Sequence, residues 1–165
     1  MTIRGSGQNL LNRGLTVCHT LLDMSNEQKT SDTCAELREA PTIAFVIPCY
    51  NEEDALQATA SVLKSKLQAL KDANQIASDS SVVFVDDGSS DKTWEVISSL
   101  HDESSDIFHG VKLAHNRGHQ NALFAGLMCA LESNVDAVIS MDADLQDDPN
   151  AVDEMILAYR QGAEP

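Results

Sequence analysis

The stretch TIAFVIPCYNEE, residues 42–53, joins a short apolar run to an abruptly polar end. Its first seven residues are mostly β-branched or aromatic and stop at a proline, a pattern typical of a strand buried on both faces. Asn51 then offers an N-cap for a helix with acids at 52–54, where the helix dipole stabilises them. The stretch therefore predicts a buried strand that leads directly into a helix.

The same unit recurs three times toward the C-terminus. Further strands are predicted at SVVFVDDGSS (81–90), HGVKLAHN (109–116) and VDAVISMDADLQ (135–146), each followed by a helical segment. Four strands that alternate with four helices predict an α/β domain with a mostly parallel sheet and helices on both faces. In such sheets, ligands bind beyond the carboxyl ends of the strands.

The helices carry expectations of their own. The first has a row of leucines on one face: Leu56, Leu63, Leu67 and Leu70. Ser90 or Asp91 can cap the second, which would turn Trp94, Ile97 and Leu100 inward. The third, 119–133, is apolar on nearly every side, which predicts burial all round, and Pro149 suits the first position of the last helix, 149–161.

Charge restricts the class of partner. The 165 residues, which fit one domain, include 26 acidic and 11 basic side chains, a formal net charge of -15. Nucleic-acid binding is excluded because it requires clustered Lys and Arg, and an anionic membrane surface would repel the chain. A phosphorylated ligand would need a bound cation or a few well-placed basic groups.

Cysteines and hydropathy indicate the compartment. The four cysteines form no CxxC pair, which favours neither a zinc site nor a disulfide framework. No segment approaches the ~20 apolar residues of a membrane span. These patterns predict a soluble, cytoplasmic chain, with residues 1–40 as a disordered or loosely attached leader and 41–165 as the domain.

Two aspartates close the fourth predicted strand, in MDADLQDDP. Asp142 and Asp144 would repel each other by ~1 kcal/mol in water and ~4 kcal/mol at an effective dielectric near 20. A divalent cation removes that cost, and Mg²⁺ or Mn²⁺ prefers carboxylate oxygens, with Gln146 as a further oxygen ligand. A solvated acidic loop is the alternative. The apolar strand that aims these groups at the ligand edge favours the metal.

The other strand ends carry weaker signals. Asp86 and Asp87 can accept hydrogen bonds from a base or ribose, although a turn with a helix cap explains them equally well. Tyr50 offers a ring for stacking, and Gly118 opens a helix whose N-terminus can face a phosphate. Each motif alone is ambiguous, but all of them fall at the same edge of the predicted sheet.

PCYNEE, VDDGSSDKT, NRGHQNALFAGL and MDADLQDDP, in this order and spacing, resemble family 2 glycosyltransferases with the GT-A fold. The branch in question contains dolichyl-phosphate mannosyltransferase and bactoprenyl-phosphate glucosyltransferases, and the resemblance covers about residues 42–162. It implies an inverting, metal-dependent transfer of a hexose from a UDP- or GDP-sugar to a polyprenyl phosphate (undecaprenyl or dolichyl) at the membrane face. The branch's members are membrane-associated on the cytoplasmic side.

The resemblance also assigns residues. Asp142 and Asp144 resemble the DxD pair, with catalytic and metal-binding roles, and Gln146 would complete the ligands to Mg²⁺ or Mn²⁺. The residues implied to hold the nucleotide-sugar are Pro48, Tyr50, Asn51, Glu52, Asp86, Asp87, Gly118 and Asp142.

The C-terminus departs from the family pattern. In the family, the sheet continues past the DxD strand with acceptor-binding elements, whereas this sequence stops at Pro165. We therefore expect the nucleotide-sugar-binding half only, with a homo-oligomer left open. The alternatives are an inactive nucleotide-sugar-binding fragment and a transferase that acts on a glycan acceptor. Two rivals from other classes fit less well: a receiver domain, and a dehydrogenase, for which no GxGxxG follows a strand.

Overall fold

The computed structural model describes residues 37–144 and 151–163. Most of the predicted leader, as well as Gln146 and Pro149, lies outside the described residues. Strands and helices alternate in the order β1 (Ile43–Cys49), α1 (Leu56–Asp72), β2 (Ser81–Asp86), α2 (Thr93–Glu103), β3 (Phe108–Lys112), α3 (His119–Glu132), β4 (Ala137–Ser140) and α4 (Ala151–Arg160). The predicted α/β alternation is confirmed.

The sheet is parallel, with strand order β3-β2-β1-β4. β1 pairs with β2 on one side and β4 on the other, and all seven of its residues are buried. The strand predicted at 135–146 was too long, because only Ala137–Ser140 pair with β1, and β3 ends at Lys112 rather than at residue 116. Residues 113–116 and 141–144 instead form loops at the carboxyl edge.

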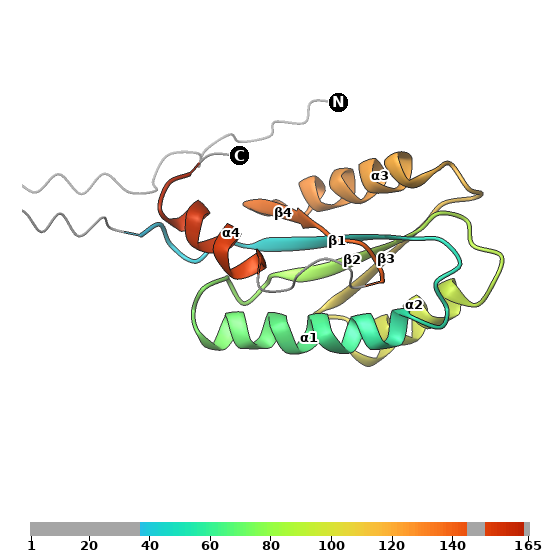
Figure 1. Cartoon of the computed structure of the whole chain (residues 1–165), viewed down its shortest axis with the longest axis horizontal. Coiled ribbons are helices and arrows are strands. Elements are labelled where there is room, and N and C mark those ends of the chain that lie inside the picture. Colours follow the sequence, from blue (N-terminus) through green and yellow to red (C-terminus); the bar gives the residue numbers. More distant parts are fainter. Residues whose placement is uncertain (1–36, 145–150, 164–165) are drawn as a thin grey trace, which may run out of the picture. The chain divides into compact units, whose positions relative to one another are not determined.

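Helices cover both faces of the sheet, as Figure 1 shows, with α1 and α2 on one side and α3 on the other. One core cluster joins β1 and β2 to α1, α2 and α4, and it contains all four leucines of the row on α1. Ile97 and Leu100 of α2 are buried as expected, while Trp94 is half-buried. The second core cluster lies under α3.

The start of α1 differs from the prediction. The helix begins at Leu56 with Ala55 at the N-cap position, and its first turn holds no acid. Asn51 is not the cap: its backbone is left-handed (φ 55°), and its side-chain oxygen accepts the N–H of Ser90 instead. The N-cap residue of α2 is Lys92, so the prediction of Ser90 or Asp91 was wrong by one or two residues, although Asp91 accepts the N–H of Thr93, the first helical residue.

Helix α3 is buried on one side only, which corrects the expectation of burial all round. Its buried residues are the smallest ones, Ala122, Gly126 and Ala130, one helical turn apart. Large apolar side chains lie outside: Phe124 is 63% exposed and Leu131 69% exposed. Side-chain size therefore chooses the buried face. In the part of the chain described here, no helix is long and apolar enough to span a membrane.

Gly126 lets α3 approach the sheet. A Cβ at this position would lie 2.4 Å from Cγ1 of Val46 and 2.9 Å from Cγ2 of Val85. We expect Gly126→Val to lower the free energy of unfolding by about 2 kcal/mol or more through overpacking. Leu131→Ala, on the exposed face, should change it by less than about 0.5 kcal/mol. Urea unfolding of both variants tests this, and equal stabilities would contradict the close approach.

Candidate functional site

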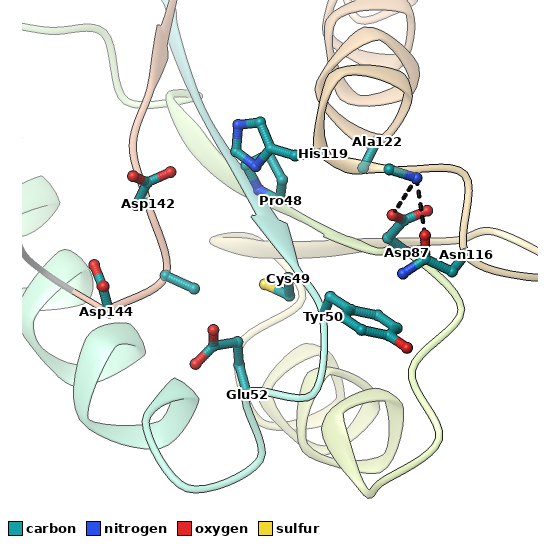
Figure 2. Close-up of a pocket in the computed structure, with 12 residues that line it drawn as sticks. Pro48, Cys49, Tyr50, Glu52, Asp87, Asn116, His119, Ala122, Asp142 and Asp144 are labelled. Carbon is teal, nitrogen blue, oxygen red and sulfur yellow. Dashed lines mark hydrogen bonds between the residues drawn. The ribbon is translucent and has the colours of Figure 1, made fainter.

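A cavity of about 270 Å³ lies at the carboxyl edge of the sheet, where the loops after β1, β2, β3 and β4 meet (Figure 2). In open α/β sheets, ligands bind in the crevice outside the carboxyl ends of the strands. The lining residues are Pro48, Cys49, Tyr50, Glu52, Asp87, Asn116, Gly118, His119, Ala122, Asp142, Ala143 and Asp144.

The structure brings together most of the residues nominated from the sequence. The nominated residues in the lining are Pro48, Tyr50, Glu52, Asp87, Gly118, Asp142 and Asp144. Asn51 and Asp86 are adjacent in sequence to lining residues but are not part of the lining, and Gln146 is outside the described residues. The four polar clusters thus converge on one cavity.

Residues 141–144 present the two aspartates by alternation. Met141 and Ala143 are each 5% exposed and belong to the core, whereas Asp142 and Asp144 are exposed. The turn is anchored from behind: the N–H of Met141 donates to the carbonyl of Val46 at 3.2 Å. Both aspartates are among the residues that line the cavity, and Figure 2 draws them with the other lining residues.

The loop after β1 is held by the loop after β2. Asn51 joins them twice, because its N–H donates to Oγ of Ser89 and its Oδ1 accepts the N–H of Ser90, both at 2.9 Å. The N–H of Glu52 donates to Oγ1 of Thr93 at 2.8 Å. These bonds give Asn51 a structural role. It fixes the backbone between Tyr50 and Glu52, the two neighbouring residues that line the cavity.

Asp87 connects β2 to the start of α3. Its Oδ1 accepts the N–H of Arg117 at 2.7 Å and its Oδ2 that of Gly118 at 2.8 Å, the latter bond drawn in Figure 2. Gly88 follows with φ +68°, and a Cβ there would lie 2.4 Å from the carbonyl carbon of His115. The 86–88 turn and the loop before α3 are therefore in direct contact.

Asp86 has a different environment. Its side chain is fully buried, and Oδ1 accepts the N–H of Ser89 at 2.9 Å. Its Oδ2 has no hydrogen-bond partner within the described part of the protein. Asp86 pairs in register with Cys49, a residue of the cavity lining. A buried carboxylate oxygen without a donor is costly, so a ligand that supplies one would be favoured here.

The thiol of Cys49 is unreactive. Burial, together with the negative charges of Glu52 and Asp86, raises the pKa of its thiol to about 12. The thiol is therefore neutral at physiological pH and lacks the thiolate that a nucleophile or metal ligand requires. Cys49 shapes the cavity wall between Pro48 and Tyr50.

The cavity is acidic. Four carboxylates line it, from Glu52, Asp87, Asp142 and Asp144, and no Lys or Arg is among the described residues that do so. Compensating positive potential comes from the N-terminal end of α3 at Gly118. Within residues 37–144 and 151–163, no three His, Cys, Asp or Glu side chains gather as a metal site.

Sequence reasoning did not nominate several lining residues, among them Cys49, Asn116 and His119. Cys49 is the last residue of an apolar strand, and nothing in that apolar pattern distinguishes a residue that lines a cavity from one in the core. Asn116 lies in the loop before α3 and His119 is the first residue of that helix, and their position just after a strand end was the available signal.

Residues 44–164 match the family described as Glycosyl transferase family 2. The chain belongs to this family. It is 44% identical over 124 residues to YkoT of Bacillus subtilis, an uncharacterized glycosyltransferase, covering 75% of this chain and 36% of that protein. It is 32% identical over 120 residues to an undecaprenyl-phosphate 4-deoxy-4-formamido-L-arabinose transferase of Photorhabdus laumondii, covering 73% of this chain and 34% of that protein.

These findings confirm the family and set aside the receiver-domain and dehydrogenase alternatives. The chain spans about a third of the length of the curated relatives that it matches. Among solved structures, the mannosyltransferase PcManGT from Pyrobaculum calidifontis, in complex with GDP-Man and Mn²⁺, has a similar fold. The TM-score is 0.53 at 24% identity, over 84% of this chain and 37% of that one. The fold is thus of the GT-A type.

The two hydrogen bonds of Asp87 should be visible in stability. We expect Asp87→Ala to lower the free energy of unfolding by about 2 kcal/mol, because it leaves the N–H of Arg117 without its acceptor and the N–H of Gly118 with only Oδ1 of Asn116 at 3.0 Å. Asp102→Ala, at an exposed acid of α2, is the matched control and should change it by less than about 0.5 kcal/mol. Chemical denaturation measures both variants, and a change no larger than the control's would refute a stabilising role for the two hydrogen bonds of Asp87.

Proposed function

We propose that this domain binds a UDP- or GDP-sugar together with Mg²⁺ or Mn²⁺ and forms the donor site of an inverting glycosyltransferase. The observation that carries the proposal is one cavity that unites the exposed ring of Tyr50 with the carboxylates of Asp142 and Asp144. A nucleotide-sugar has the matching parts: a flat base at one end and a diphosphate that attracts a divalent cation at the other.

The base would occupy the end near Tyr50. The ring is 47% exposed and borders the cavity, so it offers a stacking surface. Asp86 is the proposed acceptor for a base N–H, which requires its buried Oδ2 to become accessible when the nucleotide binds. Uracil and guanine both carry such a ring N–H, which supports UDP or GDP as the carrier.

Asp87 plays a supporting part. Both of its oxygens already accept backbone N–H groups, so the carboxylate contributes chiefly by holding Gly118 at the cavity wall. The N-terminal end of α3 would then face the phosphates, and its partial positive charge favours them.

The residues at the DxD turn fit a hard divalent cation. Asp142 and Asp144 provide anionic oxygens on the same side of a turn anchored in the core, and Gln146 is the proposed further ligand by sequence. When bound, the cation supplies charge stabilisation for the diphosphate leaving group. It also offsets the repulsion between the diphosphate and the four carboxylates of the lining.

The acceptor is proposed from the relatives. One of them is named for transfer to undecaprenyl phosphate, which supports a polyprenyl phosphate acceptor at the cytoplasmic membrane face. An acceptor phosphate oxygen would form the new bond to the anomeric carbon while the bond from that carbon to the diphosphate oxygen breaks, with inversion. The phosphate is already ionised, so the reaction needs no strong general base.

The assay that tests the function uses the 165-residue chain with UDP-glucose or GDP-mannose, Mn²⁺ and a polyprenyl phosphate. A glycolipid product establishes transfer. Donor binding without product would support the alternative of an inactive nucleotide-sugar-binding fragment, and absence of binding would refute the donor site.

Removal of one DxD carboxylate should remove the metal dependence. We expect Asp144→Ala to abolish the Mn²⁺-dependent part of nucleotide-sugar binding, measured by isothermal titration calorimetry. The control is Glu132→Gln, which deletes an exposed negative charge at the far end of α3 from the cavity and should leave binding unchanged. Wild-type titrations from Asp144→Ala would count against this metal site.

Removal of the stacking surface should act on the base alone. Tyr50→Ala should weaken UDP or GDP binding by about tenfold, from the ~1–3 kcal/mol of a base–aromatic stack. Affinity for inorganic phosphate should change little, and Tyr50→Phe, which keeps the ring, should bind nucleotide normally. Equal losses for nucleotide and phosphate would exclude stacking as the role of Tyr50.

A further inference from the structure

We propose that Thr59, on helix α1, is a positioning residue that sets the geometry of the DxD turn and thereby the affinity of the cavity for its divalent cation. The proposal rests on the donor site described above. Thr59 lies outside all four motif clusters and does not line the cavity, so it would act through the turn that carries Asp142 and Asp144.

The contact is short, buried and distant in sequence. Oγ1 of Thr59 donates to the carbonyl of Ala143 at 2.5 Å, across 84 positions of the chain. Thr59 is 2% exposed and Ala143 5% exposed, so water does not compete for this bond. A buried carbonyl that loses its donor costs more than an exposed one, which makes the bond a strong constraint.

The ordinary role of a threonine within a helix does not account for this contact. A helical Thr commonly donates to the carbonyl four residues earlier, and Ala55 does lie at 3.2 Å from Oγ1. A hydroxyl has one proton, however, and the acceptor at 2.5 Å takes it in preference to the one at 3.2 Å. The hydroxyl is therefore used chiefly to hold the DxD turn.

Fixing this carbonyl fixes the aspartates. The carbonyl of Ala143 and the N–H of Asp144 belong to one planar peptide group, so orienting the carbonyl also orients the bond that leads to Asp144. The side chain of Ala143 is held in the core at the same time. Because the carbonyl and the side chain of Ala143 are both fixed, the backbone that carries Asp142 and Asp144 is held in place at the cavity.

Affinity for a hard cation depends on such preorganisation. Two carboxylates repel each other, and a turn that could rotate would separate them in the absence of the cation. Binding would then include the cost of bringing them together again. Loss of the Thr59 hydroxyl should therefore weaken cation binding and leave the recognition of the base, at the Tyr50 end, unchanged.

The test measures the affinity of the 165-residue chain for UDP, or for GDP if that nucleotide binds more tightly, with Mn²⁺ and with EDTA. The dissociation constant with EDTA divided by the dissociation constant with Mn²⁺ isolates the cation's contribution. We expect Thr59→Val, which keeps the shape and removes the hydroxyl, to reduce this ratio about tenfold with the EDTA value unchanged. Thr59→Ser, which keeps the hydroxyl, should retain the wild-type ratio.

Ser61→Ala is the matched control. Ser61 lies on the exposed side of the same helix and donates to the carbonyl of Gln57 at 3.0 Å, so this variant removes a helical hydroxyl bond without touching the DxD turn. Its ratio should equal that of the wild type. If Thr59→Val does not fold, as judged by circular dichroism, Thr59→Ala replaces it.

Three results would overturn the inference. Wild-type dissociation constants in Thr59→Val, both with Mn²⁺ and with EDTA, show that the hydroxyl does not position the site. Equal losses with Mn²⁺ and with EDTA show that Thr59 supports the fold only. A wild-type chain whose nucleotide affinity does not respond to Mn²⁺ refutes the proposed metal site itself, and the role of Thr59 falls with it. Electron paramagnetic resonance of bound Mn²⁺ in the UDP complex provides an independent readout.

Discussion

Strand β1 must satisfy its backbone through both of its neighbours, because all seven of its residues are buried and water is not available to them. It therefore occupies the interior of the sheet, between β2 and β4, with α1 and α3 packed on opposite faces. The chain leaves this strand at the centre of the carboxyl edge. The loops that follow β2 and β4 lie on either side of the carboxyl end of β1, and the cavity lies between these loops.

Acidic groups at this edge have two distinct environments. One set is hydrogen-bonded to the backbone of the fold: Asp87 accepts two N–H groups at the start of α3, and Asp91 accepts the N–H of Thr93 at the start of α2. The other set, Asp142 and Asp144, is exposed and lines the cavity. Identical side chains at one edge of the sheet thus differ in their surroundings: some accept backbone N–H groups of neighbouring loops, and others are exposed at the cavity.

The sequence predicts the strands, their parallel pairing and the edge at which the polar clusters meet, because strand patterns and clusters are local and the topology rules are general. It also predicts most of the polar residues that line the cavity, but not the contacts that hold the loops in place. Asn51 seemed a helix cap, yet a left-handed turn directs it to Ser90, a residue 39 positions away. Helix α3 seemed buried all round because hydropathy ignores size. Thr59 carried no signal, since its partner, Ala143, is identified only in three dimensions.

The uneven packing of α3 has a practical consequence for work with this protein. Small residues fix the helix against the sheet, while Phe124, Met128 and Leu131 contribute little to that contact and remain in solvent. These outward positions are suitable for polar replacements that improve solubility, or for a spectroscopic label. Either change would sit on the outside of the helix, and the cavity at its N-terminal end would keep its shape.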